Sequence, residues 1–350
     1  MNTLNYIGSK KTLLNTILKV LKDNIEDIND RDFADLFAGT GTVGFNVNIN
    51  NICKSVTSND LEYYSYIINS ALLESVYSEK IQKIIDELNN TEELIEGLIY
   101  KNFSNHEGCE RMFFTNKNAK KCDTIRIKIN ELLLNETINK AEFNFLLASI
   151  IVSIDKYANT SSVYGAYLKK FKKSSLKEFI LKPIHTNKKY NPHNNVFNKK
   201  IETLVKEEEF DIVYLDPPYN SRQYGGNYSP LNYIAHYDKD IELKGKTGLM
   251  KNYNKSIFCS KPRAKSAFEK LIDNIKCNYL IISYNNEGIL NEEDLIDILL
   301  KKGSVKLYKI KYNKFKAQKN VLVKHTFEYL WFINVEEIPD FEEIELDLIK

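Results

Sequence analysis

Residues 211–219 read Asp-Ile-Val-Tyr-Leu-Asp-Pro-Pro-Tyr, an apolar run followed by an acid, two prolines and an aromatic residue. The apolar run Ile-Val-Tyr-Leu is short and rich in β-branched and aromatic residues, which is typical of a buried strand. The two prolines end that strand and fix the backbone just beyond it. Because ligands of open α/β sheets bind at the carboxyl ends of the strands, we expect Asp216 and Tyr219 to lie at a binding site.

The four residues Asp216-Pro217-Pro218-Tyr219 resemble the signature of amino-methyltransferases. An exocyclic amino group of a base is a poor nucleophile, because its lone pair is delocalised into the ring. Asp216 and the Pro217 carbonyl can accept its two N–H groups and so turn the lone pair toward an electrophilic methyl group. Tyr219 offers a flat face on which an extruded base can stack. The plainer alternative is a Pro-Pro turn that follows a core strand and carries an incidental Asp.

A glycine-rich turn lies earlier, where residues 33–44 read Phe-Ala-Asp-Leu-Phe-Ala-Gly-Thr-Gly-Thr-Val-Gly. Gly39 and Gly41 allow a tight turn and a close approach of backbone to ligand. The short strand that follows ends in Asp60, and an acid at that place commonly binds ribose hydroxyls. NAD and S-adenosylmethionine both carry an adenosyl ribose, so these residues alone fit either a dinucleotide or a methyl donor.

The segment before the first expected helix, residues 5–10, reads Asn-Tyr-Ile-Gly-Ser-Lys. Ser9 is the expected cap of that helix, which by itself is an ordinary amphipathic one. Its apolar positions recur at helical spacing: Leu13, Leu14, Ile17, Leu18 and Leu21.

Together these motifs resemble the DNA N6-adenine methyltransferases of the Dam-like class, in which the donor-binding motifs precede the catalytic motif. The resemblance spans nearly the whole chain and is strongest at the glycine loop and at residues 216–219, whereas Tyr6 stands where the family usually has Trp. It implies the cofactor S-adenosyl-L-methionine, held by Tyr6, Gly8, Lys10, Asp35, Phe37, Gly39, Gly41 and Asp60. It also implies the catalytic residues Asp216, Pro217, Pro218 and Tyr219.

The implied function is site-specific methyl transfer to the N6 amino group of adenine in double-stranded DNA by base flipping. The implied fold is α/β, a Rossmann-like S-adenosylmethionine-dependent methyltransferase sheet with an inserted, mostly helical target-recognition region. Residues 155–168 also resemble a subset that includes methyltransferases of restriction–modification systems. A cognate restriction endonuclease, acting on the same site without a stable complex, is therefore a candidate partner.

Sequence patterning divides the chain into three parts. Residues 1–78 and 207–335 are expected to form the catalytic domain. Residues 79–206 are expected to form a helical insertion followed by a basic target-recognition region, and residues 336–350 a peripheral acidic tail. The later elements of the catalytic domain are expected at 279–283, 304–312 and 326–334 for strands and at 291–301 for a helix.

Charge is unevenly distributed in a chain whose net charge is only +2. Residues 169–206 carry eleven Lys and two acids, residues 301–325 carry nine Lys and no acid, and the tail 336–350 carries seven acids and one Lys. Concentrated positive charge is what a phosphate-binding surface requires, although solvated lysine-rich faces are the alternative. The residues expected to contact nucleic acid are Lys169, Lys170, Lys172, Lys173 and Arg222.

Composition supports an ordinary globular enzyme. No run reaches the length of a transmembrane helix and no signal-peptide core is present, so a cytoplasmic monomer without a membrane partner is expected. The five Cys residues form no close pair, which gives no reason to expect a metal site.

Three rival functions stay open at this point. Cytosine N4 or an RNA base could be the target of the same chemistry, although the Asp at 216 favours adenine by resemblance. An NAD-dependent oxidoreductase would use the glycine loop but would not explain residues 216–219. A DNA-binding protein without catalysis is disfavoured by the intact tetrapeptide.

Overall fold

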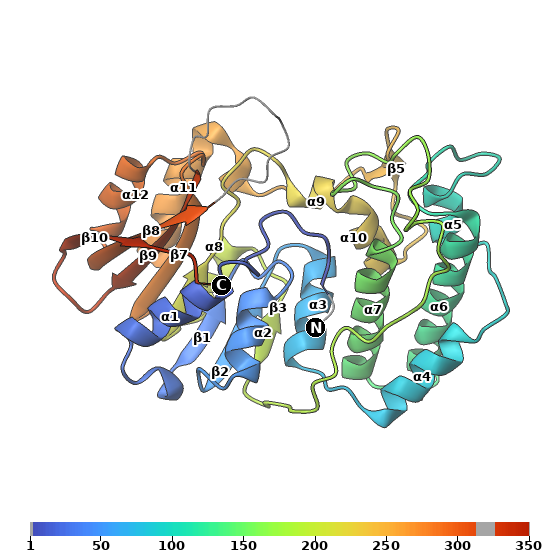
Figure 1. Cartoon of the computed structure of the whole chain (residues 1–350), viewed down its shortest axis with the longest axis horizontal. Coiled ribbons are helices and arrows are strands. Elements are labelled where there is room, and N and C mark those ends of the chain that lie inside the picture. Colours follow the sequence, from blue (N-terminus) through green and yellow to red (C-terminus); the bar gives the residue numbers. More distant parts are fainter. Residues whose placement is uncertain (1–2, 313–325, 350) are drawn as a thin grey trace.

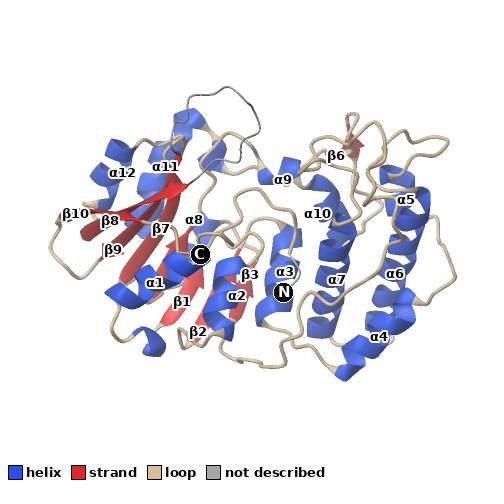
Figure 2. Cartoon of the chain, in the orientation of Figure 1, coloured by secondary structure: helices blue, strands red, loops and turns tan. Residues whose placement is uncertain are grey.

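The central feature of the described residues is an eight-stranded mixed sheet, which lies to one side of a group of helices (Figure 2). The structure is a computed structural model that describes residues 3–312 and 326–349. The strand order of the sheet is β10-β8-β9-β7-β4-β1-β2-β3. The strands from β3 to β7 are parallel to one another, and β9 is antiparallel to both β7 and β8. The strands are β1 (Asp32–Asp35), β2 (Ser55–Asn59), β3 (Asn195–Phe197), β4 (Ile212–Leu215), β7 (Tyr279–Asn285), β8 (Ser304–Tyr312), β9 (Thr326–Asn334) and β10 (Phe341–Leu346).

The order of the parallel strands reverses between β1 and β4, which is the point where ligands bind in open α/β sheets. The two strands pair in register, with Phe33 opposite Ile212 and Asp35 opposite Tyr214. The glycine loop that follows β1 and the Asp216 loop that follows β4 therefore leave the same edge of the sheet side by side.

Strand β4 is buried on both faces, which explains its continuous apolar run. Ile212 and Tyr214 pack into the core beneath the first helices, while Val213 and Leu215 pack into a second core on the opposite face. The first group of helices is α1 (Leu14–Asn24), α2 (Thr42–Ile49) and α3 (Tyr63–Leu73). The second is α8 (Ile201–Glu207), α11 (Lys261–Asn274) and α12 (Glu292–Leu299).

A helical lobe stands beside the sheet, beyond α3 (Figure 1). The apolar residues of α4 lie on one face of the helix, and Ile81, Ile84, Ile85 and Leu88 are all buried. Helix α10, which comes from the segment after β4, packs against α3 and α7 and so joins the lobe to the segment that follows the Asp216 loop. The lobe consists of α4 (Glu79–Asn89), α5 (Leu98–Phe103), α6 (Asn116–Leu134), α7 (Lys140–Asp155) and α10 (Ser229–His236).

Two expectations about element boundaries need correction. Ser9 does not cap the first helix, which begins at Leu14, because a turn closed by the Leu13 N–H and the Lys10 carbonyl lies between them. Strand β3 lies inside the range 79–206 yet pairs with β2, so the sheet resumes before residue 206. Its three residues are too few to show a strand pattern.

The acidic tail was expected to be peripheral, and residues Phe341–Leu346 form β10, an edge strand with mostly exposed side chains that pairs with β8. The two strands pair in parallel from Phe341 opposite Val305 to Leu346 opposite Ile310, and Lys309 of β8 also lies 2.8 Å from Glu343. Ile344 and Leu346 of β10 also pack against the core. The expected strands at 304–312 and 326–334 are confirmed.

Candidate active site

The glycine loop between β1 and α2 needs its glycines for geometric reasons. Gly39 and Gly41 have φ values of +51° and +70°, a region that favours glycine. A Cβ atom on Gly39 would come within 3.1 Å of the Tyr6 ring, and one on Gly41 within 2.7 Å of Asn69 Oδ1. Side chains from the amino-terminal segment and from α3 therefore pack closely against the loop and restrict its conformation.

Asp60, at the end of β2, fixes this loop. Its carboxylate accepts hydrogen bonds from the Gly39 N–H and the Glu62 N–H, each at 2.8 Å. Burial raises the pKa of Asp60, and these backbone donors oppose the rise. Asp60 thus connects the glycine loop to the start of α3. This structural role is additional to the predicted role of Asp60 as a ribose ligand.

Asp35 has an unused acceptor atom. Its Oδ2 accepts a hydrogen bond from the Gly44 N–H at 3.3 Å, whereas Oδ1 is buried and has no hydrogen-bond partner among the described residues. Burial raises the pKa of Asp35 to about 8, and the nearby carboxylates of Asp216 and Asp60 add to the rise. A cationic ligand group at Oδ1 would satisfy this atom and keep Asp35 ionised.

Asp216 is paired with Lys10, which sequence reasoning had assigned to the donor. Lys10 Nζ lies 2.8 Å from Asp216 Oδ1, and the two side chains are 7% and 18% exposed. Burial raises the pKa of Asp216, and Lys10 limits that rise. Burial by itself would lower the pKa of Lys10, but the carboxylates of Asp216 and Glu328 overcome this and raise it, so the lysine stays charged.

Residues of strands β7 and β9 lie next to Tyr219 and Lys10. The Tyr219 ring, which is half-buried, meets Tyr284 edge to face with centroids 6.2 Å apart. Glu328 of β9 accepts a hydrogen bond from Asn285 Nδ2 at 3.1 Å, and its Oε2 is buried without a partner among the described residues. Neither Glu328 nor Asn285 was predicted as a site residue, because the strand pairing that brings them here cannot be read from the sequence.

The segment after Tyr219 contains the adjacent glycines Gly225 and Gly226, which are typical of a flexible loop, yet it forms the short helix α9 (Tyr224–Asn227) and runs into α10. Tyr224 and Tyr228 of this segment contact Tyr6 and Ile7 near the amino terminus. Tyr6 stacks on Tyr228 with centroids 4.8 Å apart, and the Tyr228 hydroxyl accepts a hydrogen bond from the Ile7 N–H at 2.8 Å. The Tyr224 hydroxyl donates to the Ile7 carbonyl at 3.3 Å. The order of this segment therefore comes from aromatic contacts with residues more than 200 positions away.

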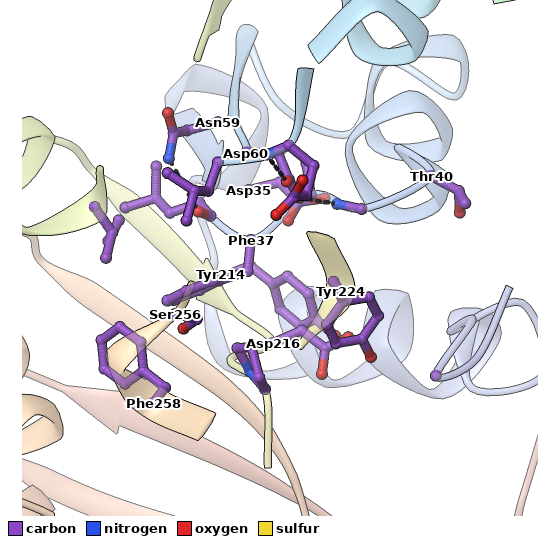
Figure 3. A pocket seen from close by; sticks show the side chains of 18 of the residues that line it. Asp35, Phe37, Thr40, Asn59, Asp60, Tyr214, Asp216, Tyr224, Ser256 and Phe258 are labelled. Carbon is purple, nitrogen blue, oxygen red and sulfur yellow. Dashed lines mark hydrogen bonds between the residues drawn. The ribbon is translucent and has the colours of Figure 1, made fainter. Parts of the chain in front are cut away.

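These features surround one cavity of about 390 Å³, a size that suits a small cofactor. In Figure 3, Asp35 and Asp60 lie on one side of Phe37, and Asp216 and Tyr224 lie on the other. The predicted residues that line it are Tyr6, Gly8, Lys10, Asp35, Phe37, Gly39, Asp60, Asp216 and Pro218. Lining residues that the sequence did not reveal are Asn59, Leu61, Glu62, Lys199, Lys200, Ile201, Gln223, Tyr224, Lys255, Ser256, Ile257 and Phe258. Gly41, Pro217 and Tyr219 are not lining residues.

The lysines predicted to contact DNA differ in exposure and in whether their ammonium groups bond within the protein. Lys169, Lys170 and Lys173 are exposed, whereas the ammonium of Lys172 donates to the Thr160 carbonyl at 2.8 Å. The loop that carries them is held by Asn159, whose side chain bonds the Lys172 N–H and the Leu168 carbonyl.

Arg222 is exposed three residues after Tyr219. In the second lysine-rich segment, Lys309 pairs with Glu292 and Glu343. Residues 313–325 of that segment lie outside the described residues.

The comparisons with known proteins decide the family. Residues 6–298 match the model of the D12 class N6 adenine-specific DNA methyltransferases. The chain belongs to this family. It is therefore an adenine-specific DNA methyltransferase, and its family and fold imply S-adenosylmethionine as the methyl donor and DNA as the substrate. The oxidoreductase interpretation of the glycine loop is thereby excluded.

Several relatives are type II methyltransferases. The chain is 42% identical over 336 residues to M.NlaIII of Neisseria lactamica, covering 93% of this chain and 98% of that protein. It is 38% identical over 340 residues to M.CviAII of Paramecium bursaria Chlorella virus 1, covering 96% and 100%. It is 36% identical over 344 residues to M.FokI of Planomicrobium okeanokoites, covering 94% of this chain and 52% of that protein.

Two features of other protein classes are absent from the described residues. None of the helices there has both the length and the apolar character that crossing a membrane requires. No group of three or more His, Cys, Asp and Glu side chains there is arranged to hold a metal ion.

Proposed function

We propose that this methyltransferase flips an adenine out of double-stranded DNA and methylates its N6 amino group with a methyl group from S-adenosylmethionine at a specific sequence. The observation that carries the proposal is the shared cavity: the glycine loop, Asp60 and Asp216 all line it. A donor bound at the glycine loop would thus lie next to the carboxylate that receives the target amine. Proximity of this kind supplies a large part of a catalytic barrier reduction.

The cavity fits the donor on three counts. The unpartnered Oδ1 of Asp35 suits the donor's ammonium group. Asp60 and Glu62, which both line the cavity, suit its ribose hydroxyls, and Gly39 allows close approach of the backbone. When bound, the donor supplies an electrophilic methyl group on a sulfonium ion.

Asp216 and the Pro217 carbonyl would accept the two N–H groups of the target amine. The hydrogen bond to Asp216 strengthens as positive charge develops on the nitrogen, so it stabilises the transition state more than the ground state. Lys10 opposes the rise that burial causes in the pKa of Asp216 and so favours its ionised form. Tyr219, held from its edge by Tyr284, would support the base by stacking.

The DNA backbone would be bound by the exposed lysines of the insertion. Lys169, Lys170, Lys173 and Arg222 are the proposed phosphate contacts, while Lys172 serves its own loop through Thr160. Such contacts fix position and affinity and leave sequence choice to other residues.

The names of the relatives support a further proposal about context. M.NlaIII and M.CviAII are type II methyltransferases. We infer that this chain protects DNA from a restriction endonuclease that acts on the same sequence without a stable complex. We also infer that it works as a monomer in the cytoplasm.

The proposal is tested by transfer of labelled methyl groups from S-adenosylmethionine to duplex DNA, followed by hydrolysis and separation of the modified nucleosides. Labelled N6-methyladenine is the expected product. N4-methylcytosine as the sole product, or methylation of RNA but not duplex DNA, would identify a rival substrate. In parallel, calorimetric titration should show saturable binding of S-adenosylhomocysteine.

A further inference from the structure

One wall of the cavity comes from an unexpected part of the chain, residues 254–258, which we call the wall segment. Four of its residues line the cavity: Lys255, Ser256, Ile257 and Phe258. In Figure 3, Ser256 and Phe258 lie on the same side of the cavity, below Phe37. The wall segment contains no strand and only the start of a 3₁₀ turn (Ile257–Cys259). Its position must therefore be set by contacts with other segments.

Three contacts with the loops of the site hold the wall segment. Asn254 Nδ2 donates to the Leu61 carbonyl at 2.8 Å, directly after Asp60. Phe258 meets Phe37 of the glycine loop edge to face, with ring centroids 5.4 Å apart. The third contact is made by the Gln223 side chain, four residues after Tyr219. The wall segment thus touches the glycine loop, the Asp60 turn and the segment that follows the catalytic tetrapeptide.

The contact by Gln223 is a double hydrogen bond to a single residue. Its Oε1 accepts from the Ser256 N–H at 2.7 Å, and its Nε2 donates to the Ser256 carbonyl at 3.1 Å. Both bonds need the amide in this one orientation. The side chain therefore pairs with Ser256 as a neighbouring strand would, and it fixes both the distance and the rotation of the wall segment.

We propose that Gln223 is a positioning residue for the methyl donor, acting through Ser256 and the wall segment. This inference rests on the proposed function, because it takes the cavity as the donor site. Gln223 also connects the wall segment to residues 216–219, because only Asn220, Ser221 and Arg222 separate Gln223 from Tyr219. Its main effect is on donor affinity, because the wall segment faces the cavity.

The test compares Gln223→Met with the wild-type protein by calorimetric titration with S-adenosylhomocysteine. Methionine keeps the volume of the side chain and removes both hydrogen bonds. The matched control is Gln82→Met, because Gln82 also makes two side-chain hydrogen bonds, to Tyr77 and Asp86, but does not line the cavity. We expect Kd to rise about tenfold for Gln223→Met, or about 1.4 kcal/mol, and less than twofold for the control.

Steady-state kinetics separates positioning from a general loss of structure. For Gln223→Met the KM for the donor should rise, while kcat at saturating donor and the Kd for DNA change less than twofold. Asn254→Ala provides a second variant, since Asn254 is exposed and its loss frees the other end of the wall segment. Its Kd for the donor should rise a few-fold.

The outcomes are distinct. If the wild type binds the donor and both wall variants bind it equally well, the inference is overturned and the proposed function stands. If the wild-type protein does not bind the donor, both the proposed function and the inference about Gln223 are refuted.

Discussion

Replacing Lys10 with Met should change the pH dependence of methyl transfer. Lys10 Nζ lies 2.8 Å from Asp216 Oδ1, and it opposes the rise that burial causes in the pKa of Asp216. Without this cation the pKa of Asp216 rises further. At a given pH a smaller fraction of Asp216 is then ionised, and activity is lost on the acid side of the profile and regained as the pH rises.

The size of the effect follows from the geometry of the pair. A hydrogen bond to a charged group contributes about 1.5–3 kcal/mol. If that energy stabilises only the ionised form of Asp216, kcat/KM on the acid side should fall by roughly 10- to 150-fold, at about 1.4 kcal/mol per factor of ten. A full Coulomb estimate would be larger, but Asp216 is 18% exposed and solvent screens part of the attraction.

The assay is kcat/KM for methyl transfer across the pH range in which the wild type is folded. Lys11→Met is the matched control, because Lys11 is the next residue and is exposed. The control should reproduce the wild-type profile. If Lys10→Met lowers the rate equally at every pH, the lysine does not act by keeping Asp216 ionised, and the reasoning is refuted.

Three other perturbations give clear outcomes. Asp216→Ala should abolish methyl transfer while the thermal unfolding profile stays cooperative, and near-normal turnover by a folded variant would show that Asp216 has been misassigned. Asp60→Ala removes two hydrogen bonds that fix the Gly39 loop and the α3 turn, so calorimetry should find donor binding at least tenfold weaker; wild-type affinity would count against that role. Replacing Lys169, Lys170 and Lys173 with Gln should weaken the salt dependence of DNA binding. The slope of the logarithm of the binding constant against the logarithm of the salt concentration should become shallower by roughly 2.7, at about 0.9 per phosphate contact. Lys172→Gln should leave that slope unchanged, and an unchanged slope in the triple variant would show that the cluster is a solvated face.

The parts of the site that sequence could predict are those encoded by local residues. The apolar run before Asp216 and the glycines before α2 each specify a strand end or a turn by themselves. The parallel order of the strands then places both loops at one edge of the sheet. For this reason most of the predicted donor residues do line one cavity.

The parts that could not be predicted depend on contacts across long sequence distances. The pairing of Lys10 with Asp216 joins residues 206 positions apart in the chain, and the stacking of Tyr6 on Tyr228 orders a segment whose glycines indicated a flexible loop. The tail forms β10 by pairing along β8, with Ile344 and Leu346 packed against the core, and its acidic composition alone does not indicate this. Each of these outcomes depends on which strands and helices become neighbours, and no local pattern carries that information.

Long-read sequencing of DNA from cells that express the wild-type protein tests the central claim most directly, because it reports both the modified base and its sequence context. The account predicts N6-methyladenine at a single recurring sequence, and none at that sequence in cells that express Asp216→Ala. Unmodified DNA with the wild-type protein, or the same modification with both proteins, would contradict the claim that this cavity methylates adenine through Asp216.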